Sequence, residues 1–266
     1  MSRKKILTIF MTGCLIAFSI HISSLCYKYY SYAKDNTYVY KEHKQIDDAI
    51  KVVMIGDSWA AYHHAAGHDS LLALMIGKYS CRHITVNASG MVGAKTKRIY
   101  ELMSDSISPT GTRSLLHQKP DYCIISAGIN DAVAKIGIEN YCYHYILIIK
   151  QLLANHIKPI VIDMPDVGYK SVYQRESFLA QFRHWLSCKI NGTNMWSFDD
   201  YRNSLIKSIE ESNYTQKIIY ISANEWNTQG FQDPRNLYME DDIHLNFKGY
   251  TLLDSCIARH ICMDIQ

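Results

Sequence analysis

The sequence predicts a three-layer α/β/α protein, in which helices cover both faces of a central, mainly parallel sheet of about five strands. Short and almost continuous apolar runs recur along the chain, as expected for strands that are buried on both faces. Longer stretches with helical spacing separate these runs, and this alternation is typical of βαβ units. The chain has 266 residues, of which 48% are hydrophobic, so it is long enough for one such domain.

The alternation can be followed element by element. The first strand, Lys51-Val52-Val53-Met54-Ile55, precedes a helix over 59–79, and the last helix closes the chain over 247–263. In an open sheet of this kind, ligands bind at the carboxyl ends of the strands. We therefore expect the functional residues directly after the apolar runs. The strands are expected at 51–55, 83–88, 121–126, 159–162 and 217–221, and the helices at 59–79, 139–155, 172–189 and 247–263.

The N-terminus carries a targeting pattern. A basic cap precedes an apolar stretch, Ile6 to Cys26, whose length suits one membrane crossing of about 20 residues. The positive cap predicts that this end stays in the cytoplasm and that the remainder is exported to the periplasmic or extracellular side. The alternatives are a cleaved signal peptide, which would give a secreted protein, and a lipid-modified Cys26.

These patterns divide the chain into three parts. Residues 1–27 are expected to form a signal-anchor or transmembrane segment, and 28–48 a polar stalk. The folded domain is expected over 49–266.

Composition excludes some classes of function. The net charge of +3 is spread along the chain and forms no basic stripe, so no nucleic-acid partner is expected. The eight cysteines show no paired zinc spacing, and buried free thiols are favoured over disulfides. His63, His64 and His68 have no acidic partner at a recognisable offset, so they are interpreted as a polar helix face. We expect no metal and no cofactor.

Two motifs carry the strongest chemical signal. Gly56-Asp57-Ser58 follows the first strand, where a serine at the start of a helix presents both its hydroxyl and a free N–H. Asp241-Asp242-Ile243-His244 lies near the other end of the chain. A carboxylate three residues before a histidine can orient it as a base within one local turn. Asp242 has a less suitable spacing, but stays open as the orienting acid.

Two further blocks follow the second and third strands. Gly90-Met91-Val92-Gly93 offers backbone N–H groups at a strand end, where glycine allows close approach of a ligand. Gly128-Ile129-Asn130 offers a side-chain amide that can donate a hydrogen bond to a developing oxyanion. Each block on its own is also compatible with an ordinary turn.

In their order, these four blocks resemble the SGNH hydrolase family, also called GDSL esterases and lipases. The resemblance covers residues 51–250 and implies the flavodoxin-like fold of that family. It implies Ser58 as nucleophile, His244 as base and Asp241 as the orienting acid. It also implies an oxyanion hole made by the Ser58 amide, Gly93 and Asn130, with Gly90 as the alternative to Gly93.

The serine motifs and the export segment predict an exported serine esterase that cleaves a small acyl ester. O-acetyl on a surface carbohydrate is the favoured substrate, on the grounds of the expected location and the 20 tyrosines. The expected partners are therefore an acyl ester or acylated glycan, and a membrane through the N-terminal helix. An acetyltransferase and a lipase or thioesterase would use the same residues. A non-catalytic glycan-binding module with this fold is the alternative from another class.

Overall fold

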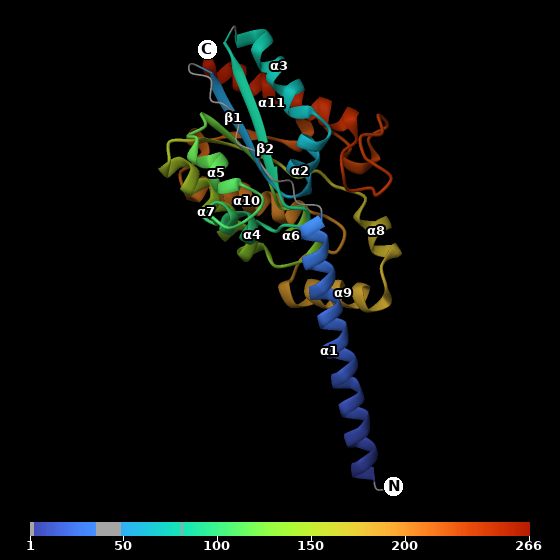
Figure 1. Cartoon of the computed structure of the whole chain (residues 1–266). Coiled ribbons are helices and arrows are strands. Elements are labelled where there is room, and N and C mark those ends of the chain that lie inside the picture. The colour runs from blue at the N-terminus through green and yellow to red at the C-terminus, as the bar shows by residue number, and fades with distance from the viewer. Residues whose placement is uncertain (1–2, 36–48, 81) are drawn as a thin grey trace.

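The central sheet has five parallel strands in the spatial order β2-β1-β3-β4-β5 (Figure 1). They are seen in a computed structural model that describes residues 3–35, 49–80 and 82–266. The predicted sheet and its parallel direction are thus confirmed. The strands are β1 Ile50–Gly56, β2 Ile84–Gly90, β3 Tyr122–Ser126, β4 Lys158–Ile162 and β5 Ile219–Ile221.

Helices cover both faces of the sheet, which makes the three predicted layers (Figure 1). On one face, α2 and α3 pack on β2, and α11 packs on α3 and β5. On the other face, α7 packs on β4 and between α4 and α10. These helices are α2 Ser58–Ala65, α3 His68–Ser80, α4 Thr96–Leu102, α7 Ile138–Ala154, α10 Asp199–Glu211 and α11 Phe247–Ile265. The shorter or peripheral helices are α5 Thr112–His117, α6 Ile129–Ala134, α8 Tyr169–Arg175 and α9 Phe178–Asn191, with 3-10 turns at Thr215–Lys217, Ala223–Glu225 and Gly230–Gln232.

Two of the predicted helices are each divided in two. The helix expected over 59–79 breaks at Gly67, whose backbone has a φ of +77°, a conformation that glycine adopts without strain. The helix expected over 172–189 breaks before Ser177, whose hydroxyl accepts a hydrogen bond from the Ala180 N–H and so caps α9.

The described cysteines are free, in agreement with the expectation from their spacing. Five of them are buried in the domain, whereas Cys14 is exposed on the N-terminal helix. Cys123 lies in β3, where burial in apolar surroundings raises the pKa of its thiol far above the ordinary range. Cys26 and Cys81 lie outside the residues whose side chains are described.

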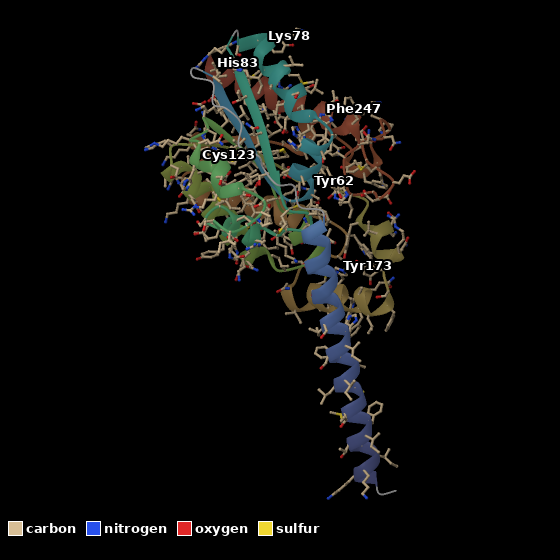
Figure 2. All side chains as sticks on the ribbon, viewed as in Figure 1. Tyr62, Lys78, His83, Cys123, Tyr173 and Phe247 are labelled. Carbon is tan, nitrogen blue, oxygen red and sulfur yellow. The ribbon has the colours of Figure 1, made fainter. Side chains whose placement is uncertain are left out.

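A separate N-terminal helix, α1, runs over Arg3–Asp35, and the side chains of residues 4–23 project outward on every side (Figure 2). Its segment Lys4–Ser23 is long and apolar enough to cross a membrane, a test that a signal sequence would also pass. The helix continues beyond the expected anchor into the expected stalk, of which the part from residue 36 to 48 lies outside the described residues.

Candidate active site

The site is built at one edge of the sheet, where three strands end at the same level. In the register of the sheet, Gly56 at the end of β1 lies beside Gly90 at the end of β2 and beside Ser126 at the end of β3. The motifs that follow these strands therefore share one edge, as expected for a parallel α/β sheet. The first of them begins α2 at Ser58.

A chain of hydrogen bonds joins Ser58, His244 and Asp241. The Ser58 Oγ lies 2.8 Å from Nε2 of His244, and Nδ1 of the same ring lies 2.5 Å from Asp241 Oδ2. Because a carboxylate can only accept, the ring donates its Nδ1–H to Asp241, which leaves Nε2 free to accept the serine hydroxyl proton. The arrangement has the connectivity of a nucleophile, a base and an orienting acid.

Asp241 is held by three donors from one short turn. Its Oδ1 accepts the N–H groups of Ile243 and His244, while Oδ2 accepts the ring. Partial burial alone would raise the pKa of Asp241, but these hydrogen bonds outweigh it and hold the pKa below its usual value. The carboxylate is therefore ionised at neutral pH.

Asp242 has different partners. Its backbone adopts a φ of +68°, and its carboxylate accepts hydrogen bonds from the Ser171 hydroxyl and from Arg175 of α8. The carboxylate thus fastens the loop to α8 and makes no hydrogen bond to His244. Of the two candidates that the sequence left open, the geometry favours Asp241.

Replacing Asp241 with asparagine is expected to lower kcat for an aryl acetate by about 10²- to 10³-fold. The amide would disturb the tautomer and orientation of His244, although the half-exposed position lets water replace part of the interaction. The matched control is Asp242→Asn, because asparagine tolerates a positive φ. The kcat of that control is expected to stay within about threefold of wild type, since the Asp242 carboxylate contacts α8 and not His244. Equal losses in the two variants would contradict the assignment of Asp241.

Aromatic residues of α2 and α11 hold the loop that carries His244. The Trp59 indole N–H donates to the Ile243 carbonyl at 3.2 Å, and the Tyr250 hydroxyl donates to the Trp59 carbonyl at 3.0 Å. The Tyr62 ring packs at 4.6 Å from the His244 ring, measured between centroids. Trp59 and Tyr62 were not among the predicted site residues. Their positions, one and four residues after Ser58, would have indicated contact with the site only if the start of α2 at Ser58 had been known.

The two glycines after β2 occupy different environments. A Cβ at Gly90 would lie 2.4 Å from both the Ala61 nitrogen and the Asp57 carbonyl oxygen, so this position lets β2 pack closely on α2. Gly93 has a φ of +75°, and a Cβ there would meet nothing within 4 Å. No hydrogen bond from the Gly93 N–H to another described residue is seen. Gly93 is therefore the more available N–H donor of the two.

The Asn130 side chain lies between the turn at Asp57 and the turn at Ala94. Its side-chain nitrogen donates to Asp57 Oδ2 at 3.2 Å and to the Ala94 carbonyl at 3.1 Å. These contacts bring the amide beside both the serine turn and the Gly93 turn. Because both amide hydrogens are engaged, an oxyanion at this position would replace one of the two acceptors.

Asp57 holds the turn that presents the serine. It is 1% exposed, and its carboxylate accepts from the Trp59 N–H and the Ser126 hydroxyl in addition to Asn130. Burial raises the pKa of Asp57 to about 7, although the hydrogen bonds from Trp59 and Ser126 lower it in part. Its place among the ends of β1, β3 and α6 gives Asp57 a role in joining these elements.

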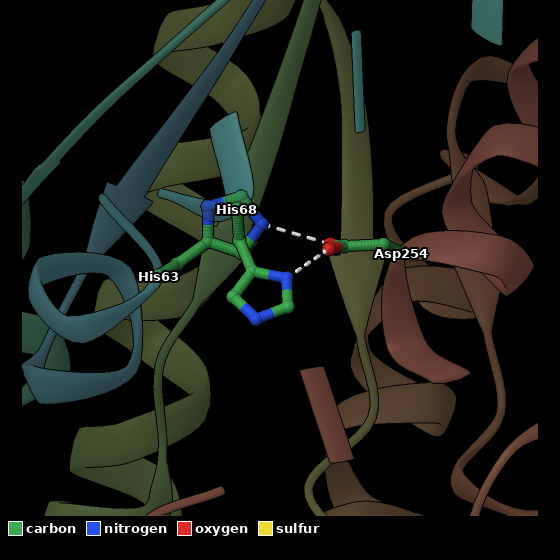
Figure 3. A group of neighbouring side chains, drawn as sticks. All are labelled: His63, His68 and Asp254. Carbon is green, nitrogen blue, oxygen red and sulfur yellow. Dashed lines mark hydrogen bonds and ion pairs between the residues drawn. The ribbon is translucent and has the colours of Figure 1, made fainter. Parts of the chain in front are cut away.

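A buried charge network lies behind α2, where the sequence predicted a polar helix face. That prediction is wrong for His63 and His68, whose side chains are fully buried. Asp254 of α11 accepts from His63 Nε2 at 2.8 Å and from His68 Nδ1 at 2.7 Å (Figure 3). The other ring nitrogen of His63 lies 2.8 Å from Asp69, which also accepts from His64.

The protonation state of this network follows from its geometry. His63 contacts a carboxylate through each ring nitrogen, so it must carry both hydrogens and a positive charge. Burial alone would lower the pKa of His63, but the two carboxylates raise it to about 9. The ligand atoms of His63, His68 and Asp254 lie within 4.8 Å of one another, a spacing that a metal ion could also use. Their contacts of 2.7–2.8 Å have the length of hydrogen bonds, and we interpret the group as a charge network.

Solved structures with a similar fold include several ester hydrolases. A lipase/acylhydrolase from Enterococcus faecalis is 20% identical, with a TM-score of 0.56, over 80% of this chain and 96% of that one. An acetyl xylan esterase is 17% identical, with a TM-score of 0.53, over 82% of this chain and 100% of that one. An acetyl-xylooligosaccharide esterase from Geobacillus is 16% identical, with a TM-score of 0.52, over 82% and 96%. At these identities the likeness shows the fold. No curated protein matches the chain.

The parallel sheet with helices on both faces is the α/β fold that this chain shares with these ester hydrolases. A family model extends this from the fold to the sequence, since it matches residues 54–252, most of the domain. The chain belongs to the GDSL-like lipase/acylhydrolase family. This confirms the resemblance predicted from the four motifs, and it makes the protein an ester-bond hydrolase.

Proposed function

We propose that the protein is a serine esterase in which Ser58 is the nucleophile, His244 the base and Asp241 the orienting acid. The observation that carries this proposal is the position of the His244 ring between the other two side chains, at 2.8 and 2.5 Å. The contact between Ser58 and His244 lies within the reach that proton transfer requires, and the contact with Asp241 holds the ring in place. The same constellation recurs on unrelated folds, so its geometry supports the roles independently of the fold.

The reaction would proceed by acyl transfer in two steps. His244 Nε2 takes the hydroxyl proton as the Ser58 oxygen attacks the ester carbonyl carbon. The tetrahedral intermediate collapses as the C–O bond to the alcohol breaks, and the alcohol leaves with the proton from His244. Water, deprotonated by the same ring, then attacks the acyl-serine. The bond from the acyl carbon to the Ser58 oxygen breaks, the acid is released, and His244 returns the proton to that oxygen.

The negative oxygen of the intermediate would accept hydrogen bonds from three groups: the N–H of Ser58, the N–H of Gly93 and the amide of Asn130. The Ser58 N–H is the first of α2, so it has no acceptor within the helix. Gly93 is open and Asn130 lies beside both turns, as described above. One such donor contributes about 3 kcal/mol in comparable sites.

A small acyl group on a carbohydrate is the substrate that the surroundings support best. A cavity of about 540 Å³ includes Gly168 and Ser171, both of which contact Asp242 beside the site. Three glutamines and two aromatic rings give it a polar wall with flat apolar faces, a combination suited to sugar hydroxyls and sugar rings. These side chains are Gln174, Gln229, Gln232, Trp196 and Phe231. The two acetylated-xylan esterases among the similar folds agree with this choice.

The place of action proposed is the outer side of a membrane, with α1 as an uncleaved anchor. The apolar segment Lys4–Ser23 and the basic residues around it support this orientation.

The substrate proposal is tested with the full chain in detergent on aryl esters of increasing acyl length. We expect kcat/KM for acetyl to exceed that for octanoyl by about tenfold or more, because a long acyl chain in the cavity beside Asp242 would cover the glutamine side chains that line it without giving them hydrogen-bond partners. An acetylated xylo-oligosaccharide should be deacetylated, as measured by released acetate. A preference for octanoyl would contradict the small-acyl proposal and favour a lipase.

The same assay separates hydrolysis from transfer. An unacetylated sugar acceptor added at high concentration would receive the acetyl group from an acetyltransferase, and acetate release would fall accordingly. For the hydrolase proposed here, acetate release is expected to be unchanged by the acceptor.

A further inference from the structure

The helix α9 exposes an unusually apolar surface. Large apolar side chains recur along it at the spacing of one helical face, whereas its two buried residues, His184 and Cys188, point to the domain. The Phe182 and Trp185 rings stack at 5.7 Å, so the exposed side chains form a continuous layer. The α9 face consists of Phe178, Leu179, Phe182, Trp185, Leu186 and Ile190, which are between 41% and 79% exposed.

Apolar surface of this kind marks a place of contact with a partner. The charges on α9 indicate which partner it is. The helix carries Arg183 and Lys189, both exposed, and no acidic residue. A helix with an apolar face, tryptophan and basic side chains is suited to the boundary between lipid headgroups and acyl chains, with anionic lipid favoured.

The position of the domain makes such a contact reachable. Residues 36–48 connect α1 to the domain, and 13 residues span at most about 45 Å. The last 12 residues of α1, which follow the apolar segment Lys4–Ser23, add about 18 Å. If α1 crosses a membrane, the domain is therefore confined within about 60 Å of the bilayer surface. In Figure 1, α9 lies at the end of the domain from which α1 extends.

A second copy of the chain would be a less suitable occupant. Helix α9 has 14 residues, so it is about 21 Å long, and a surface about 10 Å wide gives roughly 200 Å². A stable dimer buries about 800 Å² on each partner. A bilayer needs no such area from the docking element, because the tether already keeps the domain close.

We propose that the α9 face docks on an anionic lipid bilayer and lies in its interfacial region. This inference rests on the proposed anchoring by α1. The α8 side chain Arg175 contacts the Asp241 carbonyl and the Asp242 carboxylate, so docking of the adjacent α9 brings the loop of the catalytic base toward the membrane surface. The esterase would then act on esters presented at that surface.

The test uses the full chain reconstituted in phosphatidylglycerol vesicles that contain brominated acyl chains, which quench nearby tryptophan. Of the four tryptophans, Trp59 and Trp226 are buried, whereas Trp185 and Trp196 are exposed. We expect brominated lipid to quench the tryptophan fluorescence of the wild type. The substitution Trp185→Phe should remove about half of the fluorescence that is quenched. Neutral phosphatidylcholine vesicles should give less quenching.

A charged variant tests the α9 face itself. In Phe182→Glu/Ile190→Glu the quenching of Trp185 should be lost, while turnover of a water-soluble aryl acetate stays within about twofold of wild type, which shows that the domain is folded. The matched control is Ile107→Glu, at an exposed position elsewhere on the domain. In this variant, brominated lipid should quench the fluorescence of Trp185 as strongly as in the wild type.

Flotation of the chain with the vesicles reports the anchor separately. If the chain floats but Trp185 is not quenched, the docking inference is overturned and the anchor stands. If the chain does not float, both fail. Shielding of Trp185 from brominated lipid together with a doubled protein mass in the vesicles would show a second copy on the α9 face, and would also overturn the inference.

Discussion

Replacement of Ser58 by alanine is expected to lower kcat for an aryl acetate by about 10⁴-fold or more. The Ser58 oxygen is the atom that would form the bond to the acyl group, and the structure places it 2.8 Å from the His244 nitrogen that would take its proton. Without that oxygen, only the binding surface and the remaining hydrogen-bond donors would contribute to the rate. The measurement is steady-state hydrolysis in detergent, corrected for the uncatalysed reaction.

His244→Ala is expected to lose a similar factor, and the double variant Ser58→Ala/His244→Ala should lose no more than either single change, because the two side chains act as one unit. Unfolding temperatures within about 2 °C of wild type would show that the fold is intact. Turnover by Ser58→Ala within tenfold of wild type would mean that another nucleophile carries the reaction. That result would refute the proposed mechanism.

Replacement of Asp254 by asparagine is expected to lower the free energy of unfolding by about 3 kcal/mol, since it removes one partner of a buried ion pair. In a domain of this size the unfolding temperature would fall by about 8 °C. Asp254 is fully buried and accepts from two histidine rings, His63 and His68. The asparagine would leave the charged His63 with a single carboxylate, that of Asp69.

The loss should depend on pH in a defined direction. The pKa of His63 is raised from 6.5 to about 9 in the folded chain, so its charged form stabilises the fold fully below about pH 6.5 and loses this effect as the pH rises through about 9. The difference in unfolding temperature between wild type and Asp254→Asn should therefore be largest near pH 6 and smallest near pH 10. His64, His68 and Asp69 are present in both proteins, so the difference between the two proteins reports mainly on the contact of Asp254 with His63.

A matched control lies on the same helix. Asp264 pairs with Lys158 in a partly exposed position, so Asp264→Asn is expected to cost less than about 1 kcal/mol. A difference between wild type and Asp254→Asn that is constant from pH 6 to 10 would show that His63 is neutral in the folded chain.

The sheet could be predicted from sequence because each strand leaves a local signal. Every expected strand overlaps an observed one, with ends that differ by at most two residues. For example, β1 was expected over 51–55 and is found over Ile50–Gly56. The breaks within helices were readable but missed: Gly67 and Ser177 are the residue types that end and begin helices. Helix α10 was also missed, although Tyr201, Leu205 and Ile209 recur at helical spacing.

The candidate site was predictable where its residues follow strands or lie close in sequence. Asp241 and His244 belong to one turn, and the serine, glycine and asparagine motifs each follow a strand. Their catalytic roles remain predictions until the variants are measured. In the His63 network only Asp69 lies close in sequence, and it was missed. The other acid, Asp254, left no such signal, because it is 191 residues away from His63 and meets it only when α11 packs on the domain.

The distance along the chain between interacting residues has a consequence for synthesis. Ser58 and His244 are separated by 186 residues, Trp59 and Ile243 by 184, and His63 and Asp254 by 191. Such non-local pairs form late, because the ends of a long intervening segment must first meet. A nascent chain that has not yet reached residue 244 therefore contains the serine without its base. Hydrolytic activity would arise only once the segment from Asp241 through α11 has packed on the sheet, so the appearance of turnover during synthesis reports that this packing has taken place.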